Sequence, residues 1–346
     1  MLSGLLAGLR GAGRPVRPVV LSADPVATHA LHGVEAHPRS PADVWKALAG
    51  ARLLISGGGS LVQDVTSARS ALYYLGTLLA ASSRGVPVAV VGQGVGPITR
   101  GWVRRMATIA FNRVQAISVR DGDSVRTLVG LGVTVPVHRG ADLAFLAPSA
   151  SPDRGRELLA AAGITGQEGV FGVAVRPWPG QRDVGDLAAS IRRFAGARRL
   201  RVIILPFDRT CDQTISQALA EMTGGRVVAA ESPADLLAVV GCTSLLLGVR
   251  LHGLIFAAAQ GVPAVGLAYD PKVPAFMAEA GLPGVLPVAA PSEAVFGALE
   301  RAWEQRAVLQ ARLRAVLPDL RQAAASAIHI VTRLLDAQPG QELRVN

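Results

Sequence analysis

The sequence predicts an α/β protein built from two doubly wound domains, and three observations support this fold class. Short apolar segments without clean alternation recur along the chain, separated by helix-like stretches, which is typical of parallel strands covered on both faces. This series stops at a Pro- and Ser-rich segment near the middle of the chain and then starts again. The chain has 346 residues, half of them hydrophobic, which is enough for two domains of ordinary size.

The first series covers the N-terminal part of the chain. The opening residues MLSGLLAGLR are interpreted as the end of an amphipathic helix. The early region that holds His29, His32 and His37 is interpreted as rich in loops. The strands of this series are predicted at residues 18–21, 53–56, 87–91, 116–119 and 135–138. Its helices are predicted at residues 41–49, 67–83, 102–113 and 123–131.

The segment APSASPD, residues 147–153, is predicted to link the two domains. The strands of the second series are predicted at residues 170–175, 201–205, 226–228, 244–247 and 264–267. Its helices are predicted at residues 184–194, 212–222, 233–239 and 254–260, and residues 292–335 are predicted to be mostly helical with a break near Pro318. The predicted domains are residues 1–149 and 150–290, facing a cleft, with the C-terminal helices of residues 291–346 packing back across them.

Composition narrows the classes of partner. A net charge of +10 fits nucleic acid, an anionic membrane surface or an anionic substrate, and it also fits a generally Arg-rich protein. Aromatic residues make up only 4% and do not alternate with basic ones as base-stacking surfaces require, so nucleic acid is disfavoured. The two cysteines are far apart, which indicates a reducing, cytoplasmic setting, and no apolar run has the length of a membrane span. No ligand cluster accompanies the early histidines, so no metal site is predicted.

The segment GVRLHGLIFAAAQGVPAVGLAYDPK, residues 248–272, carries most of the functional information. Its pattern is strand, charged turn, helix and strand. Side chains at the carboxyl end of a strand face the ligand crevice of an open α/β sheet, and a helix N-terminus there favours an anion. Arg250 and His252 therefore indicate anion binding with proton transfer. Lys272 is one of only two lysines in a chain whose other basic residues are arginines. Its position directly after the Arg–His segment indicates either that the site requires a compact, titratable charge or that the lysine is there by chance.

Two glycine-rich segments follow strands of the first series. The segment ISGGGS, residues 55–60, is expected to offer backbone N–H groups to an anion through Gly58, Gly59 and Ser60. In the segment GQGVGP, residues 92–97, Gln93 is placed to bind a sugar hydroxyl. Each segment also fits a tight glycine turn, and neither matches a dinucleotide or Walker fingerprint.

Arg120 and Arg176 each end a buried strand. A charge at such a position is paired or faces a ligand, so a structural ion pair is the alternative for each. Together with Arg250 and Lys272 they would form a pocket for a ligand with several negative charges.

The segments LLISGGGSLVQD, VVGQGVGP, SVRD, GADLAF and GVRLHGLIFAAAQGVPAVGLAYDPK resemble those of polysaccharide pyruvyl transferases, most closely the bacterial cell-surface type, CsaB. The resemblance covers nearly the whole chain and implies a fold like that of GT-B glycosyltransferases. It implies transfer of a pyruvyl group from phosphoenolpyruvate to N-acetylmannosamine of a lipid-linked precursor, as a ketal, without a metal or nucleotide cofactor. The polymer made from this precursor anchors surface-layer proteins to the cell wall.

With this chemistry, Arg120, Arg250 and Lys272 are expected to hold the phosphate and the carboxylate, with Arg176 near them. His252 is the expected general acid or base. The enzyme is expected in the cytoplasm, with peripheral contact to the inner face of the membrane.

Members of the family usually open with a strand and a loop of the type GYYGxxNxGDE, whereas this chain begins inside the following helix. A truncated or misassigned start is expected, with an open edge or a gap in the first sheet and part of the acceptor site missing.

Two other functions stay open from the sequence. One is a glycosyltransferase that uses a nucleotide sugar on the same fold, and the other is a non-catalytic protein that binds a sugar or polymer.

Overall fold

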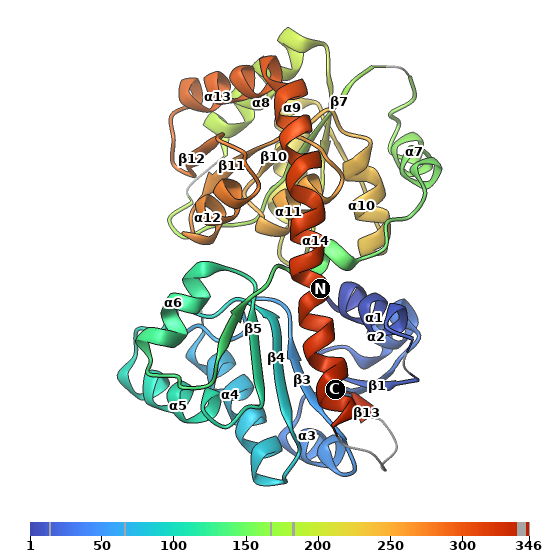
Figure 1. Ribbon diagram of the computed structural model, residues 1–346. Coiled ribbons are helices and arrows are strands. Elements are labelled where there is room, and N and C mark those ends of the chain that lie inside the picture. The colour runs from blue at the N-terminus through green and yellow to red at the C-terminus, as the bar shows by residue number, and fades with distance from the viewer. Residues whose placement is uncertain (14, 66, 167, 182–183, 338–343, 346) are drawn as a thin grey trace. The chain divides into compact units, whose positions relative to one another are not determined.

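The computed structural model describes residues 1–13, 15–65, 67–166, 168–181, 184–337 and 344–345 (Figure 1). The chain forms two compact units. Unit 1 comprises Met1–Ala147 and Leu320–Asn346, and unit 2 comprises Pro148–Asp319. Within the described part of the chain every strand pair is parallel, so the predicted α/β class is correct. The C-terminal residues, predicted as a third segment, are shared between the two units.

Unit 1 alternates strands and helices. Its strands are β1 (Arg17–Ser22), β2 (Glu35–Pro38), β3 (Leu54–Gly57), β4 (Val88–Gln93), β5 (Ala116–Val119), β6 (Val137–Arg139) and β13 (Arg344–Val345). Its helices are α1 (Leu2–Gly11), α2 (Pro25–His32), α3 (Pro41–Leu48), α4 (Ala68–Ser83), α5 (Gly101–Phe111), α6 (Gly122–Gly130) and the short 3₁₀ helix η1 (Leu143–Leu146).

The strands of unit 1 bury both faces, because successive side chains point to opposite sides of a sheet. Leu54 and Val90 belong to a core on one face, where α3 to α6 pack. Ile55 and Val91 belong to a core on the other face, which contains α1 and the last part of the C-terminal helix. This two-sided burial explains why the strands read as apolar runs without alternation.

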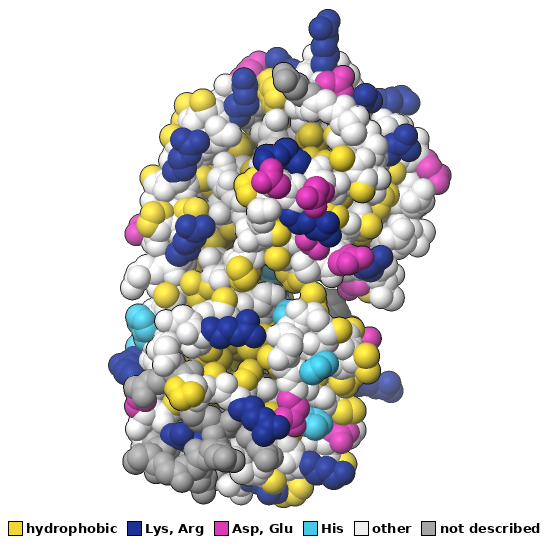
Figure 2. Space-filling view, turned by 90° about the vertical axis from the view of Figure 1, so that its right-hand side faces the viewer, with side chains coloured by type: hydrophobic (Ala, Val, Ile, Leu, Met, Phe, Trp, Pro, Cys, Tyr) yellow, Lys and Arg dark blue, Asp and Glu magenta, His cyan; other side chains and the backbone are white. Residues whose placement is uncertain are grey.

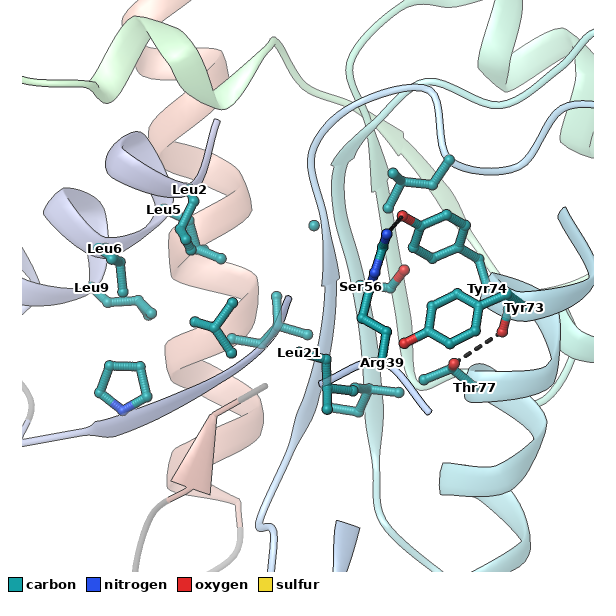
Figure 3. Close-up of a pocket in the computed structure, with 16 residues that line it drawn as sticks. Leu2, Leu5, Leu6, Leu9, Leu21, Arg39, Ser56, Tyr73, Tyr74 and Thr77 are labelled. Atoms are coloured by element: carbon teal, nitrogen blue, oxygen red, sulfur yellow. Dashed lines mark hydrogen bonds between the residues drawn. The ribbon is translucent and has the colours of Figure 1, made fainter. Parts of the chain in front are cut away.

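The strands of unit 1 form two separate sheets, one in the order β13-β1-β2 and one in the order β3-β4-β5-β6. A pocket of about 230 Å³ lies between β1 and β3 (Figure 3). Leu2, Leu5 and Leu9 of α1 line it on one side, and Tyr73 and Tyr74 of α4 line it on the other. Within the described residues β1 and β3 are not paired, and this pocket lies between them.

Unit 2 contains one six-stranded sheet in the order β12-β11-β10-β7-β8-β9. Its strands are β7 (Val170–Ala174), β8 (Arg201–Ile204), β9 (Arg226–Val227), β10 (Leu245–Gly248), β11 (Ala264–Ala268) and β12 (Val285–Pro287). Its helices are α7 (Pro152–Ala161), α8 (Gly185–Arg198), α9 (Gln213–Thr223), α10 (Pro233–Gly241), α11 (Leu251–Ala259), α12 (Lys272–Glu279), α13 (Ser292–Glu304) and the first part of α14 (Arg306–Asp336).

The centre of unit 2 is aromatic on one face of the sheet. Phe171 of β7 packs edge-on against Phe194 of α8 with ring centroids 5.0 Å apart, and Phe194 packs against Trp303 of α13 at 6.1 Å. Edge-to-face ring pairs add to the stability gained by burying the rings. This packing joins α8 to β7 and α13 to α8.

The predicted break near Pro318 is wrong. The helical region is interrupted at Gln305, and α14 runs through Pro318 for 31 residues. Proline lacks an N–H and disfavours a helix interior. Here its side chain is exposed, while Leu313 before it and Leu320 after it are buried, one in each unit. Packing on both sides therefore maintains the helix across the proline.

The early histidine region is also more regular than predicted. His29 and His32 lie on α2, and His37 lies on β2. The Asp24 carboxylate accepts a hydrogen bond from the backbone N–H of Ala27 and caps α2, with Pro25 at its first position and Gly33 at its end. These are ordinary helix start and stop signals.

Candidate active site

In unit 1, the predicted site residues lie at the carboxyl ends of β3, β4 and β5 or in the loops that follow them. These three strands are neighbours in one parallel sheet, so their carboxyl ends share one edge. Ser60 follows β3, Gln93 ends β4 and Arg120 follows β5. None of the predicted site residues lines the apolar pocket between β1 and β3.

Arg120 is only 5% exposed and is bonded through three of its nitrogens. Nη1 donates to Asp142 Oδ2 (3.0 Å), Nη2 donates to Ser60 Oγ (2.8 Å) and Nε donates to Asp121 Oδ2 (3.4 Å). The guanidinium therefore ties together three segments of unit 1 and is balanced by two carboxylates. This is the ion-pair environment that a buried arginine requires.

Gly94 is required for this arrangement. A Cβ at Gly94 would lie 3.0 Å from both Nε and Nη2 of Arg120 and 3.1 Å from Ser60 Oγ. The backbone N–H of Gly94 donates to the carbonyl of Gly59 (2.8 Å), which fastens the two glycine-rich loops together. The absence of a side chain is what lets the loop pass beside the buried guanidinium.

The ISGGGS loop was expected to leave its backbone N–H groups for an anion, and this is wrong for Gly58. Its N–H donates to the carbonyl of Val91 (3.0 Å). Gly58 and Gly59 both have positive φ, which glycine adopts without strain. The loop is therefore at least partly the tight glycine turn of the alternative interpretation.

Gln93 is fully buried. Ser56 Oγ donates to its Oε1 (3.2 Å), while its Nε2 has no hydrogen-bond partner among the described residues. Buried amide groups without a partner are uncommon, and they indicate a missing ligand or water. This observation supports Gln93 as a binding residue.

In unit 2, the predicted site residues gather along one edge of the sheet. β11, β10 and β7 are consecutive neighbours, and Gly248 of β10 pairs with both Ala174 of β7 and Gly266 of β11. Arg176 comes two residues after Ala174, and Arg250 comes two residues after Gly248. The strand register thus brings these arginines to adjacent strand ends.

Arg250 is held by a buried carboxylate. Its Nε donates to Asp212 Oδ2 (2.8 Å) and its Nη2 donates to Asp212 Oδ1 (2.5 Å) in a bidentate pair. Asp212 is fully buried, and Asp208 lies 3.8 Å from Nη2. Among the described residues Nη1 has no hydrogen bond. The pair therefore fixes the guanidinium and leaves one of its edges to donate elsewhere.

Asp208 stays ionised beside this pair. The backbone N–H of Cys211 donates to its carboxylate and lowers its pKa, burial acts in the opposite direction, and the N–H of Thr210 and the charge of Arg250 lower the pKa further. The same carboxylate raises the pKa of the exposed Cys211 thiol, chiefly through its charge. Cys211 is therefore a protonated thiol at neutral pH.

Arg176 has different partners. Nη1 donates to the Tyr269 hydroxyl (2.9 Å), Nε donates to the carbonyl of Pro177 (3.2 Å), and the guanidinium lies 5.3 Å from the centre of the Tyr269 ring. Within the described part of the chain no carboxylate pairs with it. Of the three strand-end arginines, Arg176 alone has only neutral partners in the described chain. Its positive charge is therefore not balanced by a carboxylate there and can attract an anion.

His252 and Lys272 occupy the first turns of two helices at the same edge. His252 is the second residue of α11 and is half-buried, and Arg250 is the N-cap of that helix. Lys272 begins α12, and its backbone N–H donates to Asp270 Oδ1 (2.9 Å). A Cβ at Gly253 would lie 2.5 Å from Cβ of Ala174, so glycine is needed for α11 to approach β7 closely.

The partners of these side chains were not predicted from the sequence. They are Asp142 for Arg120, Asp212 and the more distant Asp208 for Arg250, and Tyr269 for Arg176. Asp208 and Asp212 lie in the segment FDRTCD after β8, the strand next to β7. Asp208 lies close enough to the end of β8 for the rule that selected the arginines to have found it, whereas Asp212 is the N-cap of α9.

Nothing in the described ranges gathers three His, Cys, Asp or Glu side chains in a way that could hold a metal ion. Glu35 accepts a hydrogen bond from His37, and His29 Nδ1 lies 2.9 Å from the carbonyl of Val34. Among the described helices, none combines the length and the apolar character that a membrane span needs.

The sequence matches the family model of polysaccharide pyruvyl transferases over residues 1–271. The chain belongs to this family. It is a transferase family, and the match covers all of the predicted site residues except Lys272. One curated relative is the amylovoran biosynthesis protein AmsJ of Erwinia amylovora, 27% identical over 252 residues. That alignment covers 66% of this chain and 60% of the relative, so the chain spans less than two thirds of that protein.

Solved structures with a similar fold include a glycosyltransferase and proteins bound to UDP or UDP-glucose. MnaA of S. aureus with UDP has a TM-score of 0.68 at 11% identity, over 100% of this chain and 96% of MnaA. HepE of Anabaena with UDP-glucose has a TM-score of 0.63 at 14% identity, over 97% and 96%. A glycosyltransferase from Rickettsia africae has a TM-score of 0.64 at 10% identity, over 97% and 95%. At these identities the similarity shows the fold, which is GT-B-like as expected.

Proposed function

We propose that this protein transfers a pyruvyl group from phosphoenolpyruvate to a saccharide as a ketal and releases phosphate. The observation that carries the proposal is the row of Arg176, Arg250, His252 and Lys272 at neighbouring strand ends of unit 2, in a chain of this family. Phosphoenolpyruvate carries a phosphate and a carboxylate, so its binding requires several cations.

Arg176 is the main anion-binding residue in this proposal, because its partners in the described chain are neutral. Arg250 contributes its Nη1 edge, since Asp212 occupies Nε and Nη2. Lys272 adds a compact positive charge at the start of α12, where the backbone N–H groups also favour an anion.

His252 is the proposed general acid or base. Ketal formation adds a proton to the methylene carbon of the donor, joins two sugar hydroxyl oxygens to the adjacent carbon, and breaks the bond from that carbon to the phosphate oxygen. The two hydroxyl protons balance the new C–H bond and the released phosphate. A titratable imidazole in the first turn of α11 suits these transfers near neutral pH.

In unit 1 we propose a role in acceptor binding for Gln93, whose buried Nε2 has no partner in the described chain. Ser60, Gly58 and Gly59 form the loop beside it. Arg120 acts in this proposal as a positioning residue that holds Ser60 and the Gly94 loop, since its nitrogens are engaged by Ser60, Asp121 and Asp142.

The acceptor class that we propose is a lipid-linked precursor of a cell-surface polysaccharide, used in the cytoplasm at the inner face of the membrane. Similarity to the CsaB type favours N-acetylmannosamine of a secondary cell-wall polymer that anchors surface-layer proteins. The relative of E. amylovora is named for amylovoran biosynthesis, which supports polysaccharide biosynthesis in general.

The test is release of inorganic phosphate from phosphoenolpyruvate in the presence of a panel of lipid-linked or analogue disaccharides. We expect phosphate release that depends on both donor and acceptor. In parallel, phosphoenolpyruvate and a UDP-sugar are compared as stabilisers of the folded protein. Stabilisation by the UDP-sugar alone, without phosphate release, would support the glycosyltransferase alternative instead.

A further inference from the structure

Exposed hydrophobic side chains concentrate on one group of helices in unit 1. Half of the large hydrophobic side chains that the described structure leaves exposed lie on α4, α5, α6 and the loop before α4. They are Val65, Leu72, Trp102, Ile109 and Val129, each 47–65% exposed. Figure 1 shows these helices together beside the β3–β6 sheet, and α4 and α5 pack against each other.

The exposed face of α5 combines apolar and basic residues. Trp102, Arg105 and Ile109 fall within a narrow arc of α5 at 3.6 residues per turn, and Arg113 follows two residues after the helix ends. All four are exposed, whereas Val103, Ala107, Ala110 and Phe111 on the opposite face are buried. Trp102 and Ile109 are 48% and 51% exposed, although the sheet side of the helix provides a core.

The segment of the chain that carries this face is basic. Between Asp64 and Asp121 the sequence contains seven arginines and no acidic residue. Arg69, Arg100, Arg104, Arg105 and Arg113 of this stretch are all exposed. On the face of the molecule in Figure 2, by contrast, Lys and Arg side chains are scattered among hydrophobic and acidic ones.

This face continues into the candidate site of unit 1. The GQGVGP loop after β4 leads directly through Thr99 and Arg100 into α5. The buried Asp64 carboxylate accepts hydrogen bonds from the backbone N–H groups of Thr99 and Arg100 (2.7–3.0 Å), which fixes the start of α5 and places Val65 beside it. Trp102 therefore stands at the end of α5 that is nearest to Gln93 along the chain.

We propose that this face, which we call the α5 surface (Val65, Trp102, Arg105, Ile109 and Arg113), docks onto an anionic lipid bilayer. Trp and Ile would enter the interfacial region, and the arginines would contact lipid phosphates. An anionic bilayer is the partner that matches an apolar stripe inside a stretch with arginines and no carboxylate. The inference rests on the proposed function and deepens it, because docking would bring a lipid-linked acceptor to the end of β4, where Gln93 lies.

The experiment is sedimentation of the full chain with vesicles of phosphatidylglycerol and phosphatidylcholine, compared with pure phosphatidylcholine. We expect binding to the anionic vesicles only, weakened by salt. Trp102→Ser with Ile109→Ser should weaken binding by more than about tenfold. Arg105→Ala and Arg113→Ala should each weaken it by about fivefold. The matched control is Met222→Ser with Val308→Ser, two exposed residues of unit 2, which should bind as the parent does.

Tryptophan fluorescence locates the contact. A blue shift on addition of anionic vesicles should disappear in Trp102→Phe while binding persists. The proposal is wrong if the parent binds neutral vesicles equally well, binds none, or loses nothing in the Trp102/Ile109 variant. Self-association of the parent that this variant abolishes, without vesicle binding, would show a protein interface instead. The assay contains no donor or acceptor, so its outcome is independent of the proposed reaction, and the variants should retain activity on a water-soluble acceptor.

Discussion

At the scale of single residues, each of the three arginines of the candidate site has defined hydrogen-bond partners. Arg250 and Asp212 form a bidentate pair in unit 2, and Arg120 is held by Asp142, Asp121 and Ser60 in unit 1. Arg176 is held by a tyrosine hydroxyl and a carbonyl. Carboxylates balance the charges of Arg120 and Arg250, whereas the partners of Arg176 are neutral. Arg176 is therefore the arginine best suited to bind an anion.

Asp212→Asn should lower kcat/KM for phosphoenolpyruvate by about 100-fold, because Arg250 loses its fixed orientation. The asparagine keeps one acceptor oxygen, so the fold should persist by circular dichroism. Asp208→Asn should lower kcat/KM less than Asp212→Asn does, because Asp208 is more exposed and lies 3.8 Å from Arg250. Unchanged kcat/KM in Asp212→Asn would contradict the positioning role of this residue.

Gly94→Ala should lower the free energy of unfolding by about 1–3 kcal/mol, because its Cβ would press on the buried Arg120 guanidinium and Ser60. Neither neighbour can move away without breaking a hydrogen bond. Gly101→Ala is the matched control, since a Cβ there meets nothing within 4 Å. Chemical denaturation of both variants measures the difference, and equal stabilities would show that the Gly94 loop has room.

The sequence located the strand-end arginines but not their partners. Arg120, Arg176 and Arg250 could be selected because a charge directly after an apolar strand is visible in one segment of sequence. Asp212 is 38 residues from Arg250, and Tyr269 is 93 residues from Arg176. No local pattern joins residues at such separations, so the pairing becomes visible only once the strand order is known.

At the scale of elements, an apolar strand was predicted more accurately than a polar strand or a helix that contains proline. Ala116–Val119 was predicted with its observed bounds, because a short apolar strand ending in Arg–Asp is unambiguous. The strand β2 was missed, because its sequence EAHP is polar and ends in proline. The helix α14 was broken at Pro318 in the prediction, since sequence cannot show that both flanks are packed.

Pro318→Ala should raise the free energy of unfolding by about 1–3 kcal/mol, because alanine restores a backbone donor in the interior of α14. The side chain of Pro318 is exposed, so little packing is lost. Thermal denaturation should show a higher midpoint for this variant and no change for the exposed Arg314→Ala. A lower midpoint would indicate that the proline is needed at this position.

Asp64 makes the start of α5 sensitive to acid. Burial raises the pKa of Asp64, but the backbone hydrogen bonds of Arg100 and Thr99 outweigh it and hold the pKa below the ordinary value of 3.8. A carboxylate with a lowered folded-state pKa contributes stability that is present above 3.8 and is lost as the pH falls through the folded-state pKa.

Asp64→Asn should therefore lower the free energy of unfolding by about 1–3 kcal/mol at neutral pH, since hydrogen bonds to a charged group are lost. The deficit relative to the parent should shrink below the ordinary pKa of the carboxyl group. Urea denaturation at neutral and acidic pH measures both values. A deficit independent of pH would mean that the charge of Asp64 is not the cause.

At the scale of the whole molecule, the chain forms two α/β units, each built on parallel strands. It belongs to the polysaccharide pyruvyl transferase family. Fold class and domain count follow from the repeated strand and helix pattern. The separation of β1 from β3 could not be predicted from composition and periodicity, because neither shows which strands pair.

Mass spectrometry of the acceptor after incubation with phosphoenolpyruvate, with phosphate measured in the same samples, tests the proposed transfer most directly. We expect the acceptor to gain one pyruvyl ketal for each phosphate released. We also expect His252→Ala and Arg176→Ala, folded by circular dichroism, to abolish both. Phosphate release without a modified acceptor, or full transfer by His252→Ala, would contradict the proposed pyruvyl transfer.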